Sequence, residues 1–492
     1  MRRNGMLLPI ASLPSPYGIG GFSKEAYEFI DLLEETGQKL WQILPLGPTS
    51  YGDSPYQSFS TFAGNPYFID LDTLAEKGWL TKEACEASDY GDNESYIDYG
   101  RIYNSRFVLL KQAFLNSDIL SDEKFTEFCK ANQHWLPDYA LYMALKNQND
   151  GKSWIEWEEE IRLRKPEAVE YYKKELEEEC NFYEFLQYEF HEQWTKVKEY
   201  AHKKGIQIVG DVPIYVAFDS ADTWANPELF QLDEKNLPLG VAGCPPDAFS
   251  ATGQLWGNPL YNWAYHKKTG YDWWLKRIAY CFDLYDIVRI DHFRGFDEYY
   301  SIPYGDETAV NGHWEKGPDM DLFNTVKEKL GELDIIAEDL GFLTESVFQL
   351  LKDSGYPGMK VLQFAFDPSE DSDYLTYKYQ RNCVVYTGTH DNDTTAGWFE
   401  KLSDGDKEVA LRYMNSFYTP KEEQHWDLIA LAMRSTADTC IIPVQDFLGL
   451  GSEARINMPS TLGDNWKWRM TKGAFSEELK EKIRRMTKLY GR

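Results

Sequence analysis

The sequence predicts a (β/α)₈ barrel, and two patterns carry this prediction. Eight short apolar runs, each ending in polar residues, recur along the 492-residue chain. Several of them, such as QIVGDV, DIVRID and CVVYTG, are rich in valine and isoleucine, which is typical of strands buried on both faces. Helical patterns lie between many of the runs, and strands that alternate with helices form a parallel sheet. A doubly wound open sheet is the alternative fold for this pattern.

The elements follow in a regular order. The predicted strands are residues 6–12, 40–46, 206–214, 285–291, 334–339, 359–366, 383–389 and 439–446. One helix is expected between Ser23, which can cap its first turn, and Gly37, where it stops. Another is expected between Thr344 and Gly355, because the apolar residues between them recur at helical spacing.

Two long segments interrupt the alternation of the catalytic barrel, which spans residues 1–492. The stretch from the second run to the third is far too long for one βα unit and looks helical, including one long helical pattern over 167–203. We therefore expect a helical insertion at about residues 75–180. Between the third and fourth runs, glycine, proline, asparagine, aspartate and tryptophan dominate residues 221–270, which predicts a loop-rich insertion beside the substrate groove.

Composition narrows the class of protein. The chain has 51 basic and 80 acidic residues, a net charge of −29, which disfavours nucleic acid and anionic membrane surfaces as partners. Its seven cysteines are scattered and form no CxxC pair, as in a reducing compartment. Pro9 interrupts the short apolar stretch near the N-terminus, and no long apolar segment follows. We expect a soluble cytoplasmic protein, a monomer or weak homo-oligomer.

Aromatic residues make up 15% of the chain. Core packing accounts for most of them, although some can line a groove for sugars, whose C–H faces stack on aromatic rings. Composition does not separate these two interpretations.

Polar residues that carry chemistry follow four of the predicted strands. They are Asp211, Arg289, Asp291, Glu338, His390 and Asp391. In a (β/α)₈ barrel the carboxyl ends of the strands meet at the active face, so these side chains are expected to converge. Any one of them, taken alone, is as well explained as a cap or a turn residue.

Paired carboxylates of this kind are the equipment of retaining glycoside cleavage. Arg289 lies two residues before Asp291 and therefore on the same side of the strand, where its charge favours an ionised nucleophile. Asp291 is the expected nucleophile. Glu338 is the expected general acid/base, which requires a pKa raised by burial and nearby negative charge.

Other kinds of site fit less well. Acidic residues and histidines at strand ends can bind metals, but the eight histidines form no HxH or HExxH pair, so we expect no metal. There is no Walker loop, and GIGG at residues 18–21 is not a dinucleotide-binding turn. No cofactor is expected.

Longer motifs carry a resemblance to a known family. They include LLPIASLPSPYGIGG, GDVPIYVAFDSADTW, PPDAFSATGQLWGNPLY, VRIDHFRGF, IAEDLG, YTGTHDND and ARINMPSTLGDNW. In this order they resemble the alpha-amylase clan of barrel enzymes and, more narrowly, the amylomaltases, which are 4-alpha-glucanotransferases of glycoside hydrolase family 77. The resemblance runs essentially end to end and is weakest across the helical insertion.

The resemblance implies a role for each matching residue. Asp291 would form a covalent glycosyl ester, Glu338 would act as acid/base, and Asp391 would stabilise the transition state through sugar hydroxyls. Arg289, His390 and Asp211 would hold the reacting glucose. The groove would be lined by Tyr56, Asp247, Phe249, Gln254, Trp256 and Asn465, although Tyr56, Phe249 and Trp256 could instead pack the loops. Family 77 enzymes need no metal.

Alternation places the neighbours His292 and Asp339 away from the site, in structural roles.

The resulting hypothesis is disproportionation of maltooligosaccharides and other alpha-1,4-glucans. The two carboxyl groups should then lie about 5–5.5 Å apart. A retaining alpha-glucan hydrolase uses the same carboxylates, and only the resemblance favours transfer. A catalytically dead glucan-binding protein is a third alternative, against which the presence of both Asp291 and Glu338 argues.

Overall fold

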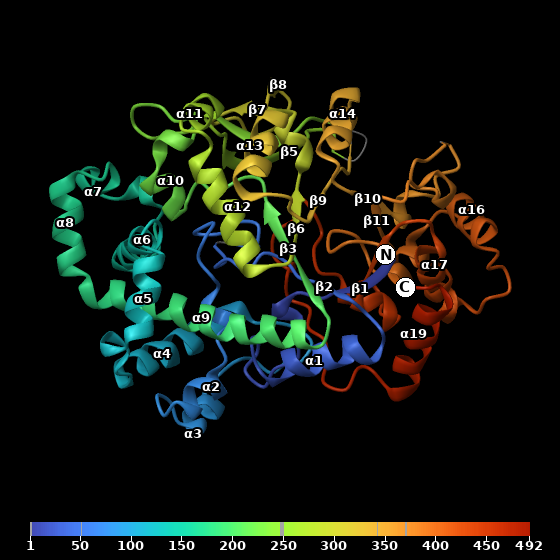
Figure 1. Cartoon of the computed structure of the whole chain (residues 1–492), viewed down its shortest axis with the longest axis horizontal. Coiled ribbons are helices and arrows are strands. Elements are labelled where there is room, and N and C mark those ends of the chain that lie inside the picture. The colour runs from blue at the N-terminus through green and yellow to red at the C-terminus, as the bar shows by residue number, and fades with distance from the viewer. Residues whose placement is uncertain (1, 51, 247–249, 342, 370) are drawn as a thin grey trace.

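The computed structural model describes residues 2–50, 52–246, 250–341, 343–369 and 371–492. At its centre, eight parallel strands close into a barrel (Figure 1). They are β1 (Arg3–Leu7), β2 (Leu40–Gln42), β3 (Gln207–Pro213), β6 (Ile287–Asp291), β9 (Ile335–Ala337), β10 (Gly358–Val361), β11 (Cys383–Tyr386) and β12 (Thr439–Pro443). They follow one another around the barrel in chain order, and β12 pairs with β1. The predicted barrel is confirmed, and the open sheet is excluded.

Each barrel strand overlaps one of the predicted runs, but the first is displaced. The apolar run covers residues 6–12, but β1 ends at Leu7. The strand does not continue because Pro9 has no N–H to donate to a neighbouring strand. The chain instead forms a short 3₁₀ turn over Ile10–Ser12, and Ile10 remains buried in the core. An apolar run therefore marked burial rather than strand.

Successive strand residues point alternately into the barrel and out towards the helices. The barrel interior is filled by Leu7, Leu40, Val209, Ile287, Ile336, Met359, Val361, Val384, Tyr386 and Ile441. Ile287 points inwards, so Arg289 and Asp291 on the same face of β6 also project into the barrel, nearer its carboxyl end. In Figure 1 the carboxyl end of β3 points towards β5 and β7.

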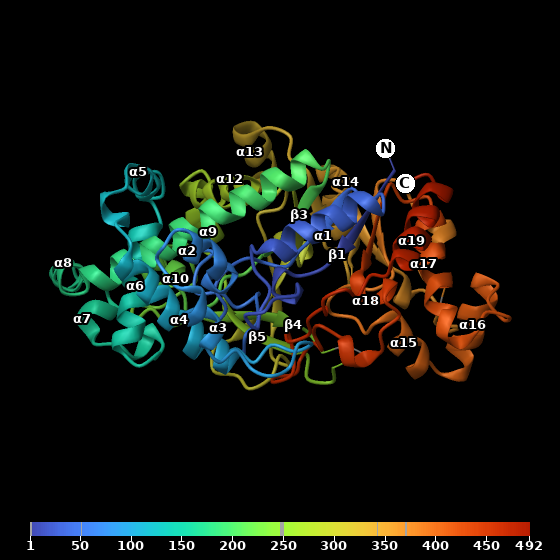
Figure 2. The same ribbon diagram turned by 90° about the horizontal axis from the view of Figure 1, so that it is seen from below.

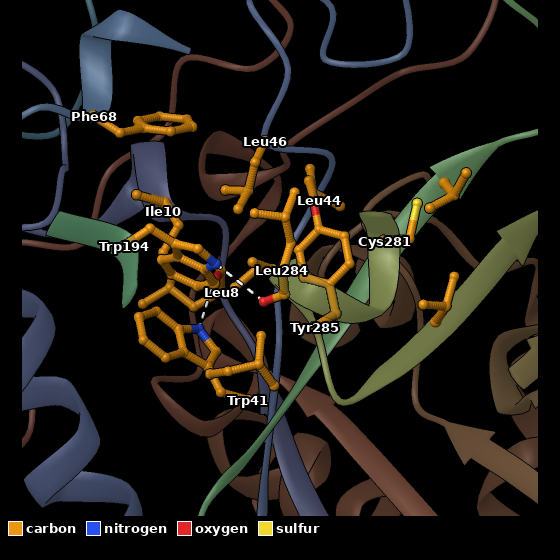
Figure 3. Close-up of a cluster of buried hydrophobic side chains, with 14 of the residues drawn as sticks. Leu8, Ile10, Trp41, Leu44, Leu46, Phe68, Trp194, Cys281, Leu284 and Tyr285 are labelled. Atoms are coloured by element: carbon orange, nitrogen blue, oxygen red, sulfur yellow. Dashed lines mark hydrogen bonds between the residues drawn. The ribbon is translucent and has the colours of Figure 1, made fainter. Parts of the chain in front are cut away.

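A second packed layer joins the barrel to its helices (Figure 3). Trp41 on β2 and Trp194 on α9 (Glu177–Lys203) are fully buried. Their indole N–H groups donate to the carbonyl oxygens of Leu8, at 2.9 Å, and Leu284, at 3.0 Å. Each tryptophan thus buries its ring without leaving its polar N–H unpaired.

The two helices expected beside β1 and β9 are present as α1 (Lys24–Glu35) and α14 (Glu345–Ser354). Gly355 ends α14 with φ of 72°, a left-handed conformation that favours glycine. Ser23 occupies the N-cap position of α1, but its hydroxyl donates to the Glu25 carboxylate at 2.7 Å instead of accepting a backbone N–H. The capping interaction predicted for Ser23 is therefore wrong.

Helices occupy the long segment between β2 and β3. They are α2 (Leu71–Glu76), α3 (Lys82–Ala87), α4 (Tyr99–Asn116), α5 (Glu123–Ala131), α6 (Leu136–Gln148), α7 (Glu159–Arg162), α8 (Pro166–Glu175) and α9. The stretch 167–203, which looks like one helix in the sequence, is divided at Leu176 between α8 and α9. Figure 1 shows α5–α8 to the left of the barrel, with α9 running back towards it.

The segment 221–270 contains α10 (Ala221–Ala225), α11 (Trp263–Lys268) and two strands, β4 (Gly240–Cys244) and β5 (Gln254–Pro259). With β7 (Glu298–Pro303) and β8 (His313–Lys316) these strands form an antiparallel sheet in the order β5-β4-β7-β8. Composition indicated only loops in this segment. It could not reveal β4, because β4 forms by pairing with β7, which lies beyond β6 in the sequence.

The remaining helices cover the second half of the barrel. They are α12 (Asp272–Leu284), α13 (Met320–Leu330), α15 (Thr395–Lys401), α16 (Asp404–Met414), α17 (Gln424–Arg434), α18 (Val444–Phe447) and α19 (Glu477–Leu489). The two ends of the chain lie close together (Figures 1 and 2), and the Arg492 guanidinium donates to the Arg3 carbonyl at 3.3 Å. No helix in the described ranges is both long and apolar enough to cross a membrane.

Candidate active site

The six chemistry-bearing residues lie at or beyond the carboxyl ends of four barrel strands. Asp211 lies in β3, and Arg289 and Asp291 lie in β6. Glu338 directly follows β9, whereas His390 and Asp391 follow β11 by a few residues. The strands bring these side chains together because parallel strands present their carboxyl ends at one face of the barrel.

Arg289 is the charged centre of the site and is only 2% exposed. Arg289 Nη1 donates to both carboxylate oxygens of Asp211 at 2.7 Å, and Arg289 Nη2 donates to Asp291 Oδ1 at 3.0 Å. Burial opposes the charged guanidinium, but Asp211 and Asp291 raise the pKa of Arg289 well above its usual value. Asp211 and Arg289 are paired residues in the β3–β6 register, so the barrel itself sets this contact.

The two central carboxyl groups differ in their affinity for a proton. Burial raises the pKa of Asp291 to about 6, with Arg289 acting in the opposite direction. Burial and the charge of Asp291 raise the pKa of Glu338 to about 8. Because the two groups interact, they titrate as a pair. The pKa of Asp291 is the lower of the two, so near neutral pH Asp291 is ionised while Glu338 keeps its proton. As expected, Arg289 lowers the pKa of Asp291 and so favours its ionised form. Burial raises that pKa by more, so the pKa of Asp291 lies above its usual value.

Backbone groups hold the Glu338 carboxyl in place. The N–H of His292 donates to Oε2 and the N–H of Leu340 donates to Oε1, each at 2.7 Å. These two bonds favour the ionised form, and they oppose the larger effect of burial.

Tyr56 joins the β3 side of the site to the segment after β11. Its hydroxyl donates to Asp211 Oδ2 at 2.8 Å and lies 2.8 Å from His390 Nε2. The two rings are stacked, with centroids 5.3 Å apart. His390 Nε2 also lies 3.3 Å from Asp391 Oδ2. The predicted residues Tyr56, Asp211, His390 and Asp391 therefore form one connected network.

The residues predicted to line the groove are placed unevenly. Gln254 and Trp256 lie on β5, where the Gln254 Oε1 accepts from the Trp256 indole N–H at 3.1 Å. Asp247 and Phe249 lie outside the described residues. Asn465 bonds within its own loop: its carboxamide accepts from the Met458 N–H at 2.9 Å and donates to the Thr461 carbonyl at 3.0 Å.

His292 does not follow the alternation that places its side chain away from the site. It lies just past the end of β6 with φ of 53°, so the two-residue alternation of a strand no longer applies. Its ring meets the Trp256 ring edge-on at 4.8 Å between centroids. Burial and Arg294 lower the pKa of His292 to about 3, so the ring is neutral. Asp339, by contrast, accepts from the Met359 N–H at 2.6 Å and links β9 to β10.

Sequence reasoning also missed Arg455, Asn457 and Trp466. Asn457 and Arg455 both contact Asp391, and the Trp466 ring lies 5.7 Å from that of Tyr56. These residues follow no strand end, and their only sequence signal was the ARINMPSTLGDNW motif. Among the described residues, no group of three or more His, Cys, Asp or Glu side chains is arranged to hold a metal ion.

Known proteins resemble this chain over most of its length. The sequence model of glycoside hydrolase family 77, described as 4-alpha-glucanotransferase, matches residues 8–475. A 4-alpha-glucanotransferase of Clostridium butyricum is 55% identical over 98% of this chain and 99% of its own. One from Thermus thermophilus is 46% identical over 99% of this chain and 98% of its own.

A solved amylomaltase from Streptococcus agalactiae, in complex with acarbose, superposes with a TM-score of 0.96. It is 43% identical and both chains are covered completely. The family model matches most of the chain and the relatives are covered almost completely, so the protein belongs to glycoside hydrolase family 77, the 4-alpha-glucanotransferases.

Proposed function

We propose that this protein transfers segments of alpha-1,4-glucans to the 4-hydroxyl of another glucan or of glucose, by a retaining double displacement at Asp291. The observation that carries this proposal is the pair of partly buried carboxyl groups at the barrel face, one bonded to Arg289 and the other to two backbone N–H groups. Asp291, beside Arg289, is ionised near neutral pH and can attack, whereas Glu338 is protonated and can donate. These are the two functions that retaining cleavage needs.

In the first step, an Asp291 oxygen attacks the anomeric carbon and the glycosidic C–O bond breaks. The proton of Glu338 passes to the departing oxygen, which leaves as the 4-hydroxyl of the released chain. Asp291 is then an ester without charge. The negative charge that helped to raise the pKa of Glu338 has disappeared, so that pKa falls and Glu338 stays ionised, ready to accept a proton from the acceptor.

In the second step, the 4-hydroxyl of an acceptor glucan enters the site. Glu338 takes the hydroxyl proton as the oxygen attacks the anomeric carbon. The ester bond breaks, and the Asp291 carboxylate is regenerated beside Arg289. Two displacements at one carbon restore its original configuration.

The surrounding network holds the reacting sugar. Arg289, Asp211, His390 and Tyr56 present a closely bonded set of donors and acceptors, and Asp391 keeps a side chain that is 40% exposed at the edge of this set. In this proposal Asp391 binds sugar hydroxyls most strongly as positive charge develops on the sugar in the transition state. The position of Trp256 against His292 supports a groove wall on β5.

The insertions and the location complete the proposal. The helical insertion, at about residues 75–180, and the loop-rich insertion, at about 221–270, form subdomains of one catalytic barrel. The presence of Gln254 and Trp256 on β5 supports the second as a wall of the groove. No disulfide joins any of the cysteines in the described residues, which supports a cytoplasmic location. No cofactor takes part, and the protein acts as a monomer or weak homo-oligomer.

Incubation with maltotriose alone, without added metal, tests the reaction. Transfer produces glucose together with maltopentaose and longer chains, with no net gain in reducing ends. The names of the curated relatives support this outcome. A steady rise in reducing ends, with only glucose and maltose as products, would instead show a hydrolase.

A further inference from the structure

Asp391 is held by a segment that lies far from it in sequence. The Asn457 side-chain amide donates to Asp391 Oδ1 at 2.6 Å. The Arg455 guanidinium donates to the Asp391 backbone carbonyl, also at 2.6 Å. One segment therefore contacts both the side chain and the main chain of Asp391.

The segment is itself rigidly anchored. The Asn457 N–H donates to the His390 carbonyl at 3.1 Å, and Arg455 Nε donates to the Asn457 carbonyl at 2.6 Å. The Gln445 amide donates to the Ala454 carbonyl at 3.1 Å. Asn457 is only 9% exposed, so its amide has little freedom to turn away from Asp391.

Within the described residues, the Asp391 carboxylate contacts the Asn457 amide and the His390 ring. The Asp391 side chain is 40% exposed, and His390 Nε2 lies 3.3 Å from its Oδ2. The Tyr56 hydroxyl also lies 2.8 Å from this nitrogen, so His390 is shared. The Asn457 amide donates to the other carboxylate oxygen, Oδ1, and so can fix the rotation of the carboxylate.

We infer that Asn457 is a positioning residue, which fixes the rotation of the Asp391 carboxylate so that it meets the sugar in the transition state. The inference rests on the proposed role of Asp391. Asn457 makes no bond to the substrate in this account, and it acts only through Asp391.

Asn457→Ala tests the inference in the full-length protein, with maltotriose as substrate. The expected result is a fall in kcat of about 10- to 100-fold, the scale of a misplaced catalytic group, with KM changed less than threefold or so. Gln445→Ala is the matched control, because it removes a bond to the same segment without touching Asp391. It should lower the Tm but leave kcat within about threefold of wild type.

Asn457→Asp adds a measurement that a purely structural role would not move. The new carboxyl would lie beside Asp391, and two adjacent carboxyl groups share one proton, so one pKa of the pair is raised. While that proton is present, the new group donates to Asp391 as the amide does. The charged or titratable groups facing the pair are His390, Asp291, Tyr56 and Arg455.

The ratio of variant to wild-type kcat is the useful quantity, since it cancels the titration of Asp291 and Glu338. For Asn457→Asp it should fall as the pH rises from about 5 to 8, and for Asn457→Ala it should be flat. An Asn457→Ala variant with wild-type kcat, or a Gln445→Ala variant that loses as much, overturns the inference. Asp391→Ala separates the two proposals: if that variant is fully active, the proposed role of Asp391 fails first.

Discussion

Replacement of Glu338 by glutamine tests the two ionisation states on which the proposed mechanism depends. In the wild type, the rate should fall below about pH 6, where Asp291 gains a proton, and above about pH 8, where Glu338 loses one. One pH unit beyond either pKa, roughly one tenth of the enzyme remains in the active state. The optimum should therefore lie near pH 7, with about tenfold lower rates at pH 5 and pH 9.

For Glu338→Gln, the loss of rate should depend on whether the leaving group of the glycosyl donor needs a proton. With maltotriose, turnover should fall by about 10²- to 10⁴-fold, the usual contribution of a general acid or base. Maltosyl fluoride releases fluoride without needing a proton from Glu338, so a burst of fluoride should persist. The burst rate should show no alkaline fall, unlike wild-type turnover of maltotriose, because fluoride needs no acid and the group that titrates near pH 8 has been removed. The acidic fall near pH 6 should remain, since it reports Asp291.

Rapid-mixing measurement of the fluoride burst from pH 5 to 9 provides the assay. A variant whose burst still declines above pH 8 would show that a group other than Glu338 titrates there, which would refute the raised pKa assigned to Glu338. Folding must be checked by urea denaturation, because both Glu338 oxygens accept backbone N–H bonds at 2.7 Å. Glutamine offers one acceptor oxygen, so one N–H loses its partner at a cost of about 1–3 kcal/mol.

The remaining predictions concern the same charged centre. The pKa of Glu338 is raised from 4.5 to about 8 on folding, so its ionisation opposes folding and wild-type stability falls as the pH rises through this window. The Tm of Glu338→Gln minus that of the wild type should therefore increase as the pH rises from 5 to 8. A difference that does not change with pH would contradict the raised pKa of Glu338. Asp291→Asn should abolish turnover but keep maltodextrin affinity by calorimetry, and residual transfer above a few per cent of wild type would refute its assignment as nucleophile. Arg289→Met leaves the buried Asp211 and the partly buried Asp291 without their cation and should cost about 3–5 kcal/mol in urea unfolding. Arg381→Met, which breaks an exposed pair with Asp438, should cost about 0–1 kcal/mol, and equal losses would contradict the reasoning.

The sequence by itself determined the barrel and the location of its chemistry. Strands buried on both faces are mostly apolar, so each of the eight overlaps a recognisable run such as QIVGDV. The polar residues in or after four of these runs marked the face that carries the site, although the run over 6–12 extends past the end of β1. Alternation along a strand also placed Arg289 beside Asp291, which the structure shows at 3.0 Å. Both inferences use only local geometry.

Features that depend on distant partners were decided by the tertiary structure. The strands β4 and β5 have little apolar periodicity and exist because β4 pairs with β7. The ring of His292 turned towards Trp256 because the strand had already ended at Asp291, where the backbone becomes left-handed. A residue beyond a strand end is no longer bound by the alternation that governs the strand.

The charge states of the site were decided at the same level. Sequence could pair a carboxylate with an arginine, but only burial makes the pKa of Asp291 rise despite that arginine and separates it from the pKa of Glu338. Asn457 reaches Asp391 across 66 residues of sequence, through a segment with no periodic signal. Local sequence patterns predict much of the secondary structure, whereas desolvation and contacts between distant segments exist only once the chain has folded.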